Sequence, residues 1–176
     1  MRGINVGGKN ALPMKALAEL FAAAGCADVR TYIQSGNVVF EASEAVAARL
    51  PAALSAAIAR RFDLRVPLMT RTAADLDAVV RGNPFLRQGA DPATLHVAFL
   101  ADLPRPEHVV ALDPRRSPPD QFLVQGREIF LCCPHGVGKS KLTNQYFDSK
   151  LNTVSTGRNW RTVLKLLELV QAGGNA

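Results

Sequence analysis

The sequence predicts an α+β protein built from two tandem ferredoxin-like lobes, each with the order βαββαβ and each followed by an extra helix. Three observations predict it. Stretches with strand character and stretches with helical periodicity alternate in the same order in both halves of the 176 residues. In each half two β-rich runs flank a turn glycine, Gly36 or Gly126. A hydrophobic fraction of 48% and a mean hydropathy of +0.04 are typical of a globular chain.

In the first lobe, residues 1–83, the turn and cap residues mark the elements. Pro13 suits the first position of a helix, and Gly36 suits the tight turn of a hairpin. Pro51 predicts a break or a kink, and Thr72 with Asp75 forms a capping box. The predicted elements are a strand of about four residues in 1–6, a helix in 13–25, a hairpin in 29–40, a helix in 43–62, a strand in 66–70 and a helix in 72–82.

The second lobe, residues 95–176, follows a linker over 84–94 that is rich in turn formers. Its elements are a strand in 95–100, a short helix in 107–112, a hairpin in 121–133, a helix in 141–151, a strand in 152–156 and a last helix that starts near Trp160. The hairpin strands "FLV" and "IFLCC" are apolar on both faces, so helices alone should not cover them. Either the two lobes pack their free sheet faces together, or a partner chain does so, in a homo-oligomer for example.

Charge and composition limit the partners. The net charge of +6 favours an anionic small molecule or nucleic acid, but it is too small to imply nucleic acid by itself. Apolar runs stay well short of the ~20 residues that a membrane span needs, and the N-terminus lacks the apolar core of a signal peptide. Three cysteines, two of them adjacent, do not make a disulfide framework. These features predict a cytoplasmic protein with no membrane partner.

Three expected helix starts share one pattern, a glycine, then a basic residue, then Asn or Ser: Gly8-Lys9-Asn10, Gly138-Lys139-Ser140 and Gly157-Arg158-Asn159. A helix N-terminus offers free N–H groups and a partial positive charge, and Lys or Arg adds a full charge. In the predicted topology the loops that carry Lys139 and Arg158 lie at one edge of the second lobe, about 10 Å apart at two strand spacings. A phosphate-bearing ligand could contact both.

The candidate ligand-binding residues form two groups. The first group lies in the second lobe: Gly138, Lys139, Ser140, Lys141, Arg158, Asn159, Trp160 and Arg161. Trp160 could stack on a base, although a place in the core is favoured. The second group, Arg2, Asn5 and Lys9, lies in the polar N-terminal loop. There an anion site and a turn that is capped by Asn5 are equally good explanations.

Other chemistries fit the sequence less well. A nucleotide-hydrolysing P-loop needs G-x-x-x-x-G-K-[S/T], but "CPHGVGKS" has Cys133 at the place of the first glycine. Cys132, Cys133 and His135 fall short of the four ligands of a zinc site, so we predict no metal and no cofactor. The two cysteines are predicted to be small buried residues of a strand. His135 could serve as a general base if the protein is an enzyme acting on a phosphorylated small molecule.

Four stretches together carry a family resemblance: "RGINVGGKN", "TYIQSGNVVF", "GVGKSKLTN" and "STGRNWRTV". In this order and spacing the chain closely resembles the bacterial domain-of-unknown-function family 1697. The resemblance implies an α+β fold of two related ferredoxin-like halves, and it implies no established activity, cofactor or catalytic residue. Members carry more apolar residues before the arginine that corresponds to Arg2, so here a misassigned start or a truncation is expected. They commonly have arginine where Lys139 stands.

The leading functional hypothesis is a protein that binds a phosphate-bearing ligand: a nucleotide, a phosphometabolite or a nucleic acid. The alternatives are an enzyme that uses the same residues, and an interaction module whose apolar sheet faces or "NPF" loop at Asn83–Phe85 bind another protein.

Overall fold

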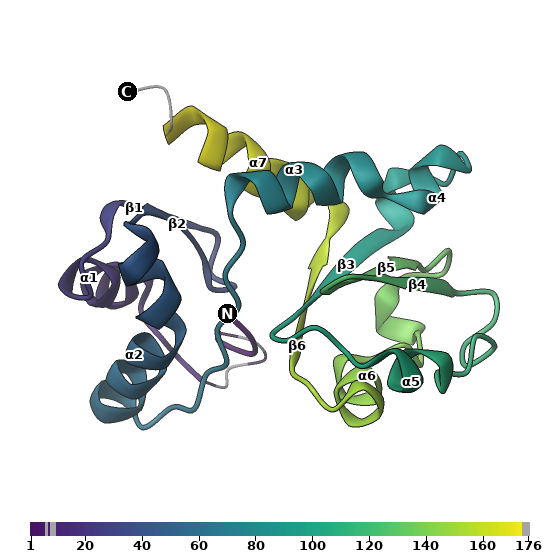
Figure 1. The fold of residues 1–176 in the computed structure, drawn as a ribbon, viewed down its shortest axis with the longest axis horizontal. Helices are drawn as coiled ribbons and strands as arrows, with labels where there is room; N and C mark the ends of the chain where they lie inside the picture. The colour runs from purple at the N-terminus through teal and green to yellow at the C-terminus, as the bar shows by residue number, and fades with distance from the viewer. Residues whose placement is uncertain (6, 8–9, 174–176) are drawn as a thin grey trace. The chain divides into compact units, whose positions relative to one another are not determined.

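A computed structural model of the chain describes residues 1–5, 7 and 10–173 (Figure 1). The chain forms two compact units: unit 1 comprises Met1–Thr70 with Leu166–Ala176, and unit 2 comprises Arg71–Lys165. The last helix, α7 (Trp160–Gly173), begins in unit 2 and ends in unit 1. This division therefore lies at Thr70 and again within α7, whereas the sequence led us to expect a linker over 84–94.

Unit 1 holds a two-stranded antiparallel sheet and two helices. Its elements are α1 (Met14–Ala23), β1 (Ala27–Tyr32), β2 (Asn37–Glu41) and α2 (Glu44–Phe62). The hairpin turns at Gly36, whose φ of +76° is a left-handed conformation that glycine adopts without strain. Ser43 caps α2 by accepting a hydrogen bond from the Val46 N–H. The helix continues through Pro51, so the break that was one of the two outcomes expected there does not occur.

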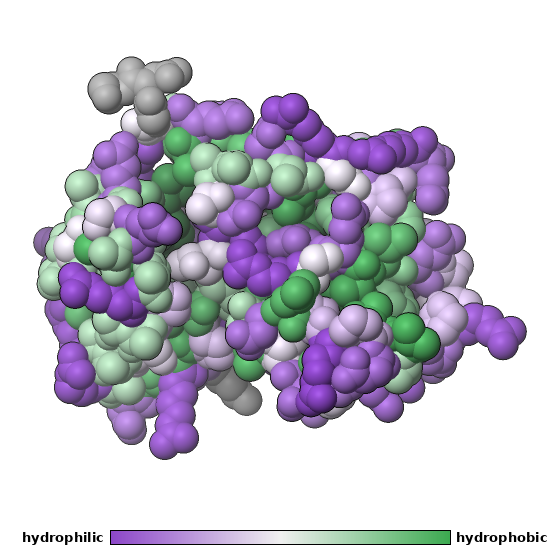
Figure 2. Space-filling view, viewed as in Figure 1, coloured by the Kyte–Doolittle hydropathy of each residue, from purple (hydrophilic) through white to green (hydrophobic). Residues whose placement is uncertain are grey.

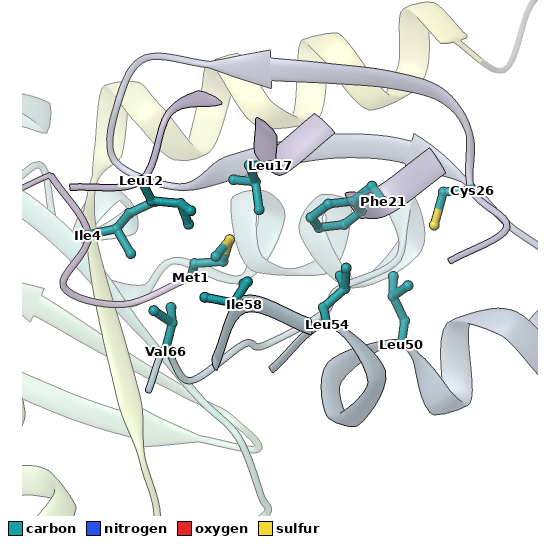
Figure 3. Close-up of a cluster of buried hydrophobic side chains, with 10 residues drawn as sticks. All are labelled: Met1, Ile4, Leu12, Leu17, Phe21, Cys26, Leu50, Leu54, Ile58 and Val66. Atoms are coloured by element: carbon teal, nitrogen blue, oxygen red, sulfur yellow. The ribbon is translucent and has the colours of Figure 1, made fainter. Parts of the chain in front are cut away.

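The core of unit 1 joins the two helices to the N-terminal residues (Figure 3). Helix α2 contributes Leu50, Leu54 and Ile58, spaced four residues apart on one face, and each is at most 1% exposed. Helix α1 presents Leu17 and Phe21 to them, again at a spacing of four. Burying large aliphatic and aromatic side chains is the main favourable term for a unit of this size.

Two strands that were predicted in unit 1 do not form. Residues 1–4 and 66–70 are outside regular secondary structure. Two backbone hydrogen bonds nevertheless fasten them: the N-terminal amine of Met1 donates to the Gly36 carbonyl at 3.1 Å, and the Arg2 N–H donates to the Pro67 carbonyl at 3.2 Å. A strand needs a ladder of such bonds along a neighbouring strand, and the segments 1–4 and 66–70 are not assigned to one. A pair of ferredoxin-like lobes is therefore not confirmed, while the α+β class with antiparallel sheets is.

Unit 2 contains a four-stranded antiparallel sheet in the order β4-β5-β3-β6. Its elements are α3 (Ala73–Gly82), α4 (Pro84–Arg87), β3 (Leu95–Leu100), α5 (Pro106–Val110), β4 (Gln121–Gln125), β5 (Glu128–Cys132), α6 (Asn144–Leu151) and β6 (Ser155–Asn159), with 3₁₀ turns at Pro92–Thr94 and Val137–Lys139. From β3 to β6 the element order is βαββαβ, as the sequence predicted for this half.

Helices cover both faces of the unit 2 sheet, with α3 on one side and α5 and α6 on the other (Figure 1). On the second side Ala98, Leu100, Ile129 and Leu131 form a core with Phe147 of α6. On the α3 side Leu95, Val97, Phe99 and Phe130 are at most 5% exposed. Of the two hairpin strands that helices alone were not expected to cover, β5 is thus covered on both faces, and the expectation is wrong for it.

The exposed edge of this sheet is less well covered. Figure 2 shows hydrophobic surface over the part of unit 2 that carries β4 and β5. Leu123 of the edge strand β4 is 43% exposed there. The polar residues Gln121 and Gln125 flank it on the same face. The apolar surface that this strand exposes is therefore interrupted on both sides.

Candidate anion-binding site

The register of the unit 2 sheet brings two of the predicted loops to one end. Across β3, Leu95 pairs with Cys132 of β5 and His96 pairs with Asn159 of β6. Strands β5 and β6 therefore both finish at this end, with β3 between them, about 10 Å apart. We call it the β5–β6 end of the sheet. The prediction that Lys139 and Arg158 lie at the same end of the second sheet is therefore correct.

The loop after β5 is a 3₁₀ turn and not the start of α6. Residues Val137–Lys139 form the turn, and Ser140 follows in an extended conformation, with its hydroxyl accepting a hydrogen bond from the Leu142 N–H at 3.0 Å. Helix α6 begins at Asn144, where the Thr143 hydroxyl caps it by accepting from the Tyr146 N–H. The expectation of a helix N-terminus at Gly138-Lys139-Ser140 is wrong, because Thr143 caps the helix and the Ser140 hydroxyl bonds to the Leu142 N–H instead.

Contacts on the α6 side of the sheet hold this loop in place. Cys133 and Leu142, at the two ends of the loop, both belong to the core beneath α5 and α6. Burial, together with the negative charge of Asp120, raises the pKa of Cys133 to about 11. At neutral pH Cys133 is therefore a thiol in a packed core, which agrees with the structural role predicted for it. The loop exposes Gly138, Lys139 and Lys141 to solvent.

At the junction of β6 and α7, unlike at Gly138-Lys139-Ser140, a helix does begin where the sequence predicted one. Asn159 does start a helix, because its side-chain oxygen accepts a hydrogen bond from the Thr162 N–H at 2.8 Å. Arg158, however, is a residue of β6 and not of a loop. Its Nη1 donates to the Thr156 hydroxyl at 3.0 Å and to the Gly157 carbonyl at 2.7 Å. Burial lowers the pKa of Arg158 to about 10.

Arg158 and the Lys139 loop approach the β5–β6 end from opposite faces. Arg158 pairs with Val97, so its side chain lies on the α3 side of the sheet. The Lys139 loop is held on the α6 side, because Cys133 and Leu142 belong to the core that includes Phe147 of α6. The candidate residues thus share an end of the sheet without converging in one pocket. The sequence pattern predicted the end of the sheet at which these residues lie, but it did not predict on which face of the sheet each one lies.

Trp160 and Arg161 divide between core and surface. Trp160 is 3% exposed, so it is a core residue, as favoured from the sequence, and not a stacking platform. Arg161, the next residue of α7, is exposed. From Lys139 to Lys165 the chain has six basic residues and one acid, Asp148. That acid accepts hydrogen bonds from the N–H and the hydroxyl of Ser155, at 2.8 and 2.6 Å.

The N-terminal candidates belong to unit 1. The Asn5 side chain donates to the carbonyls of Leu12 and Gln34, at 3.0 and 2.9 Å, and accepts from the Leu12 N–H at 2.8 Å. These bonds support the turn-capping explanation for Asn5. Arg2 is half-buried, and Lys9 lies outside the described residues. Helix α1 begins at Met14, so the helix start expected at Gly8-Lys9-Asn10 is also wrong.

Two cations near this end of the sheet were not among the site residues predicted from the sequence. Arg115 and Arg116 stand in what reads as a plain surface loop, "RRSPPD". In the structure the Lys141 N–H donates to the Ser117 hydroxyl at 3.0 Å, which joins this loop to the one that carries Lys139. The two loops are 24 positions apart, so no local pattern could have shown that they are neighbours.

Comparisons with known proteins agree with the resemblance seen in the sequence. The family model described as "Protein of unknown function (DUF1697)" matches residues 1–130. The chain belongs to this family. A solved structure, that of the conserved bacterial protein SP0830 from Streptococcus pneumoniae, is similar to this family member with a TM-score of 0.73 and 22% sequence identity, covering 97% of this chain and 94% of that one. At that identity the likeness shows the fold alone. No curated protein matches the sequence.

The described part of this family member adds three observations about chemistry. Within residues 1–5, 7 and 10–173 no group of three or more His, Cys, Asp or Glu side chains is placed to hold a metal ion. His135, the general base considered from the sequence, is exposed in the loop after β5. The helices of the described ranges are all too short or too polar to span a membrane.

Proposed function

We propose that the protein binds a phosphate-bearing anionic ligand at the β5–β6 end of the unit 2 sheet. The observation that carries the proposal is the strand register, in which Cys132 and Asn159 flank the same end of β3. This register supports a shared end for Lys139, Lys141 and Arg161, which are all exposed. Gly138, Ser140, Arg158 and Asn159 complete the candidate set.

The electrostatics of this end favour an anion. The one acid between Lys139 and Lys165 is engaged with Ser155, so the exposed cations face little local competition. The first turn of α7 contributes the partial positive charge of a helix N-terminus. Arg158, which is half-buried, adds positive charge to the α3 side of the same end. We assign this binding to the cytoplasm, since the three cysteines are all free thiols.

As part of the same proposal, we infer that unit 1 is a reduced copy of the fold of unit 2. Met1 bonds to Gly36, directly before β2, and Arg2 bonds to Pro67 in the segment predicted as a strand. In unit 2 the central strand β3 likewise lies between β5 and β6. In this proposal the N-terminal residues of unit 1 correspond to β3, the central strand of unit 2.

Titration with inorganic pyrophosphate tests the binding. Trp160 is the only tryptophan and lies next to Asn159 and Arg161, so its fluorescence can report a ligand there. Saturable change is expected with the native protein. The double variant Lys139→Ala/Arg161→Ala should bind roughly tenfold more weakly, because two surface charges contribute up to about 1 kcal/mol each.

Lys150→Ala is the matched control. Lys150 is an exposed cation in the last turn of α6, at the opposite end of the sheet, where Ser155 pairs with Leu100. The Lys150→Ala variant should bind pyrophosphate with the affinity of the native protein. Equal affinity of the native protein and the double variant, or no saturable binding by calorimetry and fluorescence together, would overturn the proposal.

A further inference from the structure

The loop that precedes β4 and the loop that follows β5 are hydrogen-bonded to each other in unit 2. The Ser117 hydroxyl accepts from the Lys141 N–H at 3.0 Å and donates to the Asp120 carboxylate at 2.7 Å. Ser117 is 8% exposed, so this junction is shielded from water. Gln121 pairs with Cys132, which places the start of β4 at the same end of the sheet as the end of β5.

Four exposed cations flank this junction: Arg115, Arg116, Lys139 and Lys141. We call them the two-loop basic surface. The acids of the same loops are engaged in holding the loops together. Asp113 accepts from the Arg115 N–H at 2.9 Å, and Asp120 accepts from Ser117. Asp120 is half-buried, unlike the four cations.

Arg116 is held in a defined orientation. Its guanidinium lies over the ring of Tyr146, 5.1 Å from the centroid, and the Tyr146 hydroxyl accepts from the Asp113 N–H at 3.0 Å. An arginine that is stacked by its face keeps its N–H edges available, and those edges match the geometry of a phosphate. Arg116 is thus pre-oriented for an anion at low entropic cost.

The arrangement favours a ligand with repeated phosphates. The four cations stand on two exposed loops, whereas the described cavity of unit 2, of about 140 Å³, lies between α3 and the turn of the β4–β5 hairpin, at the other end of the sheet. A single small phosphate would engage few of these cations at once. A nucleic-acid strand carries one phosphate per nucleotide and can meet several of them.

Resting on the proposed function, we propose that the ligand is a nucleic acid and that the two-loop basic surface binds its phosphate backbone. The binding depends on charge and not on base sequence, because the Tyr146 ring is covered by Arg116 and is not presented to a base. Arg115 and Arg116 thereby join Lys139 and Lys141 as binding residues.

Fluorescence anisotropy with a labelled oligodeoxythymidine tests this inference on the full chain. The association constant is measured over a series of salt concentrations for the native protein and for Arg115→Ala/Arg116→Ala. Each phosphate contact to a single strand contributes about 0.7 to the slope of log K against log salt, so the double variant should lower the slope by about 1.4. The charge-matched control is Arg105→Ala/Lys150→Ala, both exposed and at the opposite end of the sheet. It should leave the slope unchanged.

Each outcome separates the inference from the proposed function. An unchanged slope in Arg115→Ala/Arg116→Ala, with far-UV circular dichroism showing an intact fold, overturns the inference. Pyrophosphate binding that depends on Lys139 and Arg161 without any oligonucleotide binding also overturns it, and leaves the proposed function standing. Binding to phosphatidylglycerol vesicles in place of the oligonucleotide reassigns the surface to lipid headgroups. Failure of both pyrophosphate and oligonucleotide to bind overturns both proposals.

Discussion

Arg71 shows what a single buried cation does in unit 2. Its side chain is 6% exposed and bonds to the Glu128 carboxylate at 2.7 Å. It also donates to the carbonyls of Leu100 and Arg127, at 2.9 and 3.0 Å, and lies 5.5 Å from the centroid of the Phe99 ring. Burial lowers the pKa of Arg71, and Glu128 acts in the opposite direction. One side chain thus ties the start of α3 to β3 and to the β4–β5 hairpin.

Replacing Arg71 should destabilise the unit strongly. Arg71→Ala leaves the Glu128 carboxylate and two carbonyls without this donor, so we expect a loss of about 3–5 kcal/mol in the free energy of unfolding. Urea unfolding followed by Trp160 fluorescence measures it. Arg71→Lys keeps the charge but loses the forked geometry of the guanidinium. Its free energy of unfolding should therefore lie between those of the native protein and Arg71→Ala.

The control for Arg71 is an arginine of the same unit in an exposed pair. Arg81 bonds to Asp77 at 2.6 Å, but its side chain is 77% exposed. Arg81→Ala should cost less than about 0.5 kcal/mol. Equal effects of the two alanine variants would show that burial and the extra hydrogen bonds of Arg71 contribute nothing to stability.

Single residues were predictable where their role is local. Trp160 and Cys133 are buried, as their apolar surroundings in the sequence indicated, and Asn159 caps α7 through a residue three positions away. Arg71 and Arg116 were not predictable in this way. Their partners, Glu128 and Tyr146, are 57 and 30 positions away in the chain, and no sequence period links residues so distant.

At the scale of elements, the capping box of α3 gives a dependence of stability on pH. The Thr72 N–H donates to the Asp75 carboxylate at 2.8 Å, and the Asp75 N–H donates to the Thr72 hydroxyl at 3.1 Å. Burial raises the pKa of Asp75, but the hydrogen bonds of Thr72 and the charges of Arg127 and Arg71 outweigh it, so the net pKa is lowered.

A carboxylate whose pKa is lower in the folded state stabilises the fold above its unfolded pKa, and this contribution is lost as the pH falls through the folded value. Asp75→Asn should therefore reduce the free energy of unfolding at neutral pH, and its difference from the native protein should shrink below about pH 4. Unfolding by urea across this pH range measures it. Asp77→Asn, which removes a half-buried carboxylate of the same helix that is paired with Arg81, controls for charge. A difference that stays constant across the range would contradict the assignment.

Elements were predicted well where their own residues determine them. Helix α3 runs from its Thr72 cap to Gly82, as the capping box indicated, and the β4–β5 hairpin turns at Gly126. The segment 66–70 reads as a strand, but a strand forms only with a ladder of hydrogen bonds to a neighbouring strand, and the structure describes both 1–4 and 66–70 outside any strand. Helix α6 starts at Asn144 and not at Lys141, because the Thr143 hydroxyl caps it while the Ser140 hydroxyl bonds to the Leu142 N–H.

At the scale of the whole molecule, each unit has a core of its own. The cluster from Met1 to Val66 lies inside unit 1, and the cluster from Ala98 to Leu151 lies inside unit 2. Units with separate cores are expected to unfold in separate transitions. Trp160 belongs to unit 2, so its fluorescence should follow that unit, whereas far-UV circular dichroism follows both.

Two leucines offer matched substitutions in the two cores. Leu54 of α2 is 1% exposed and Leu100 of β3 is 0% exposed, so Leu→Ala should cost about 2–5 kcal/mol in either unit. We expect Leu100→Ala to lower the urea midpoint of Trp160 fluorescence, and Leu54→Ala to lower only a transition seen by circular dichroism. If Leu54→Ala shifted the fluorescence midpoint by as much as Leu100→Ala does, the two cores would unfold as one cooperative system, and the independence of the units would be wrong.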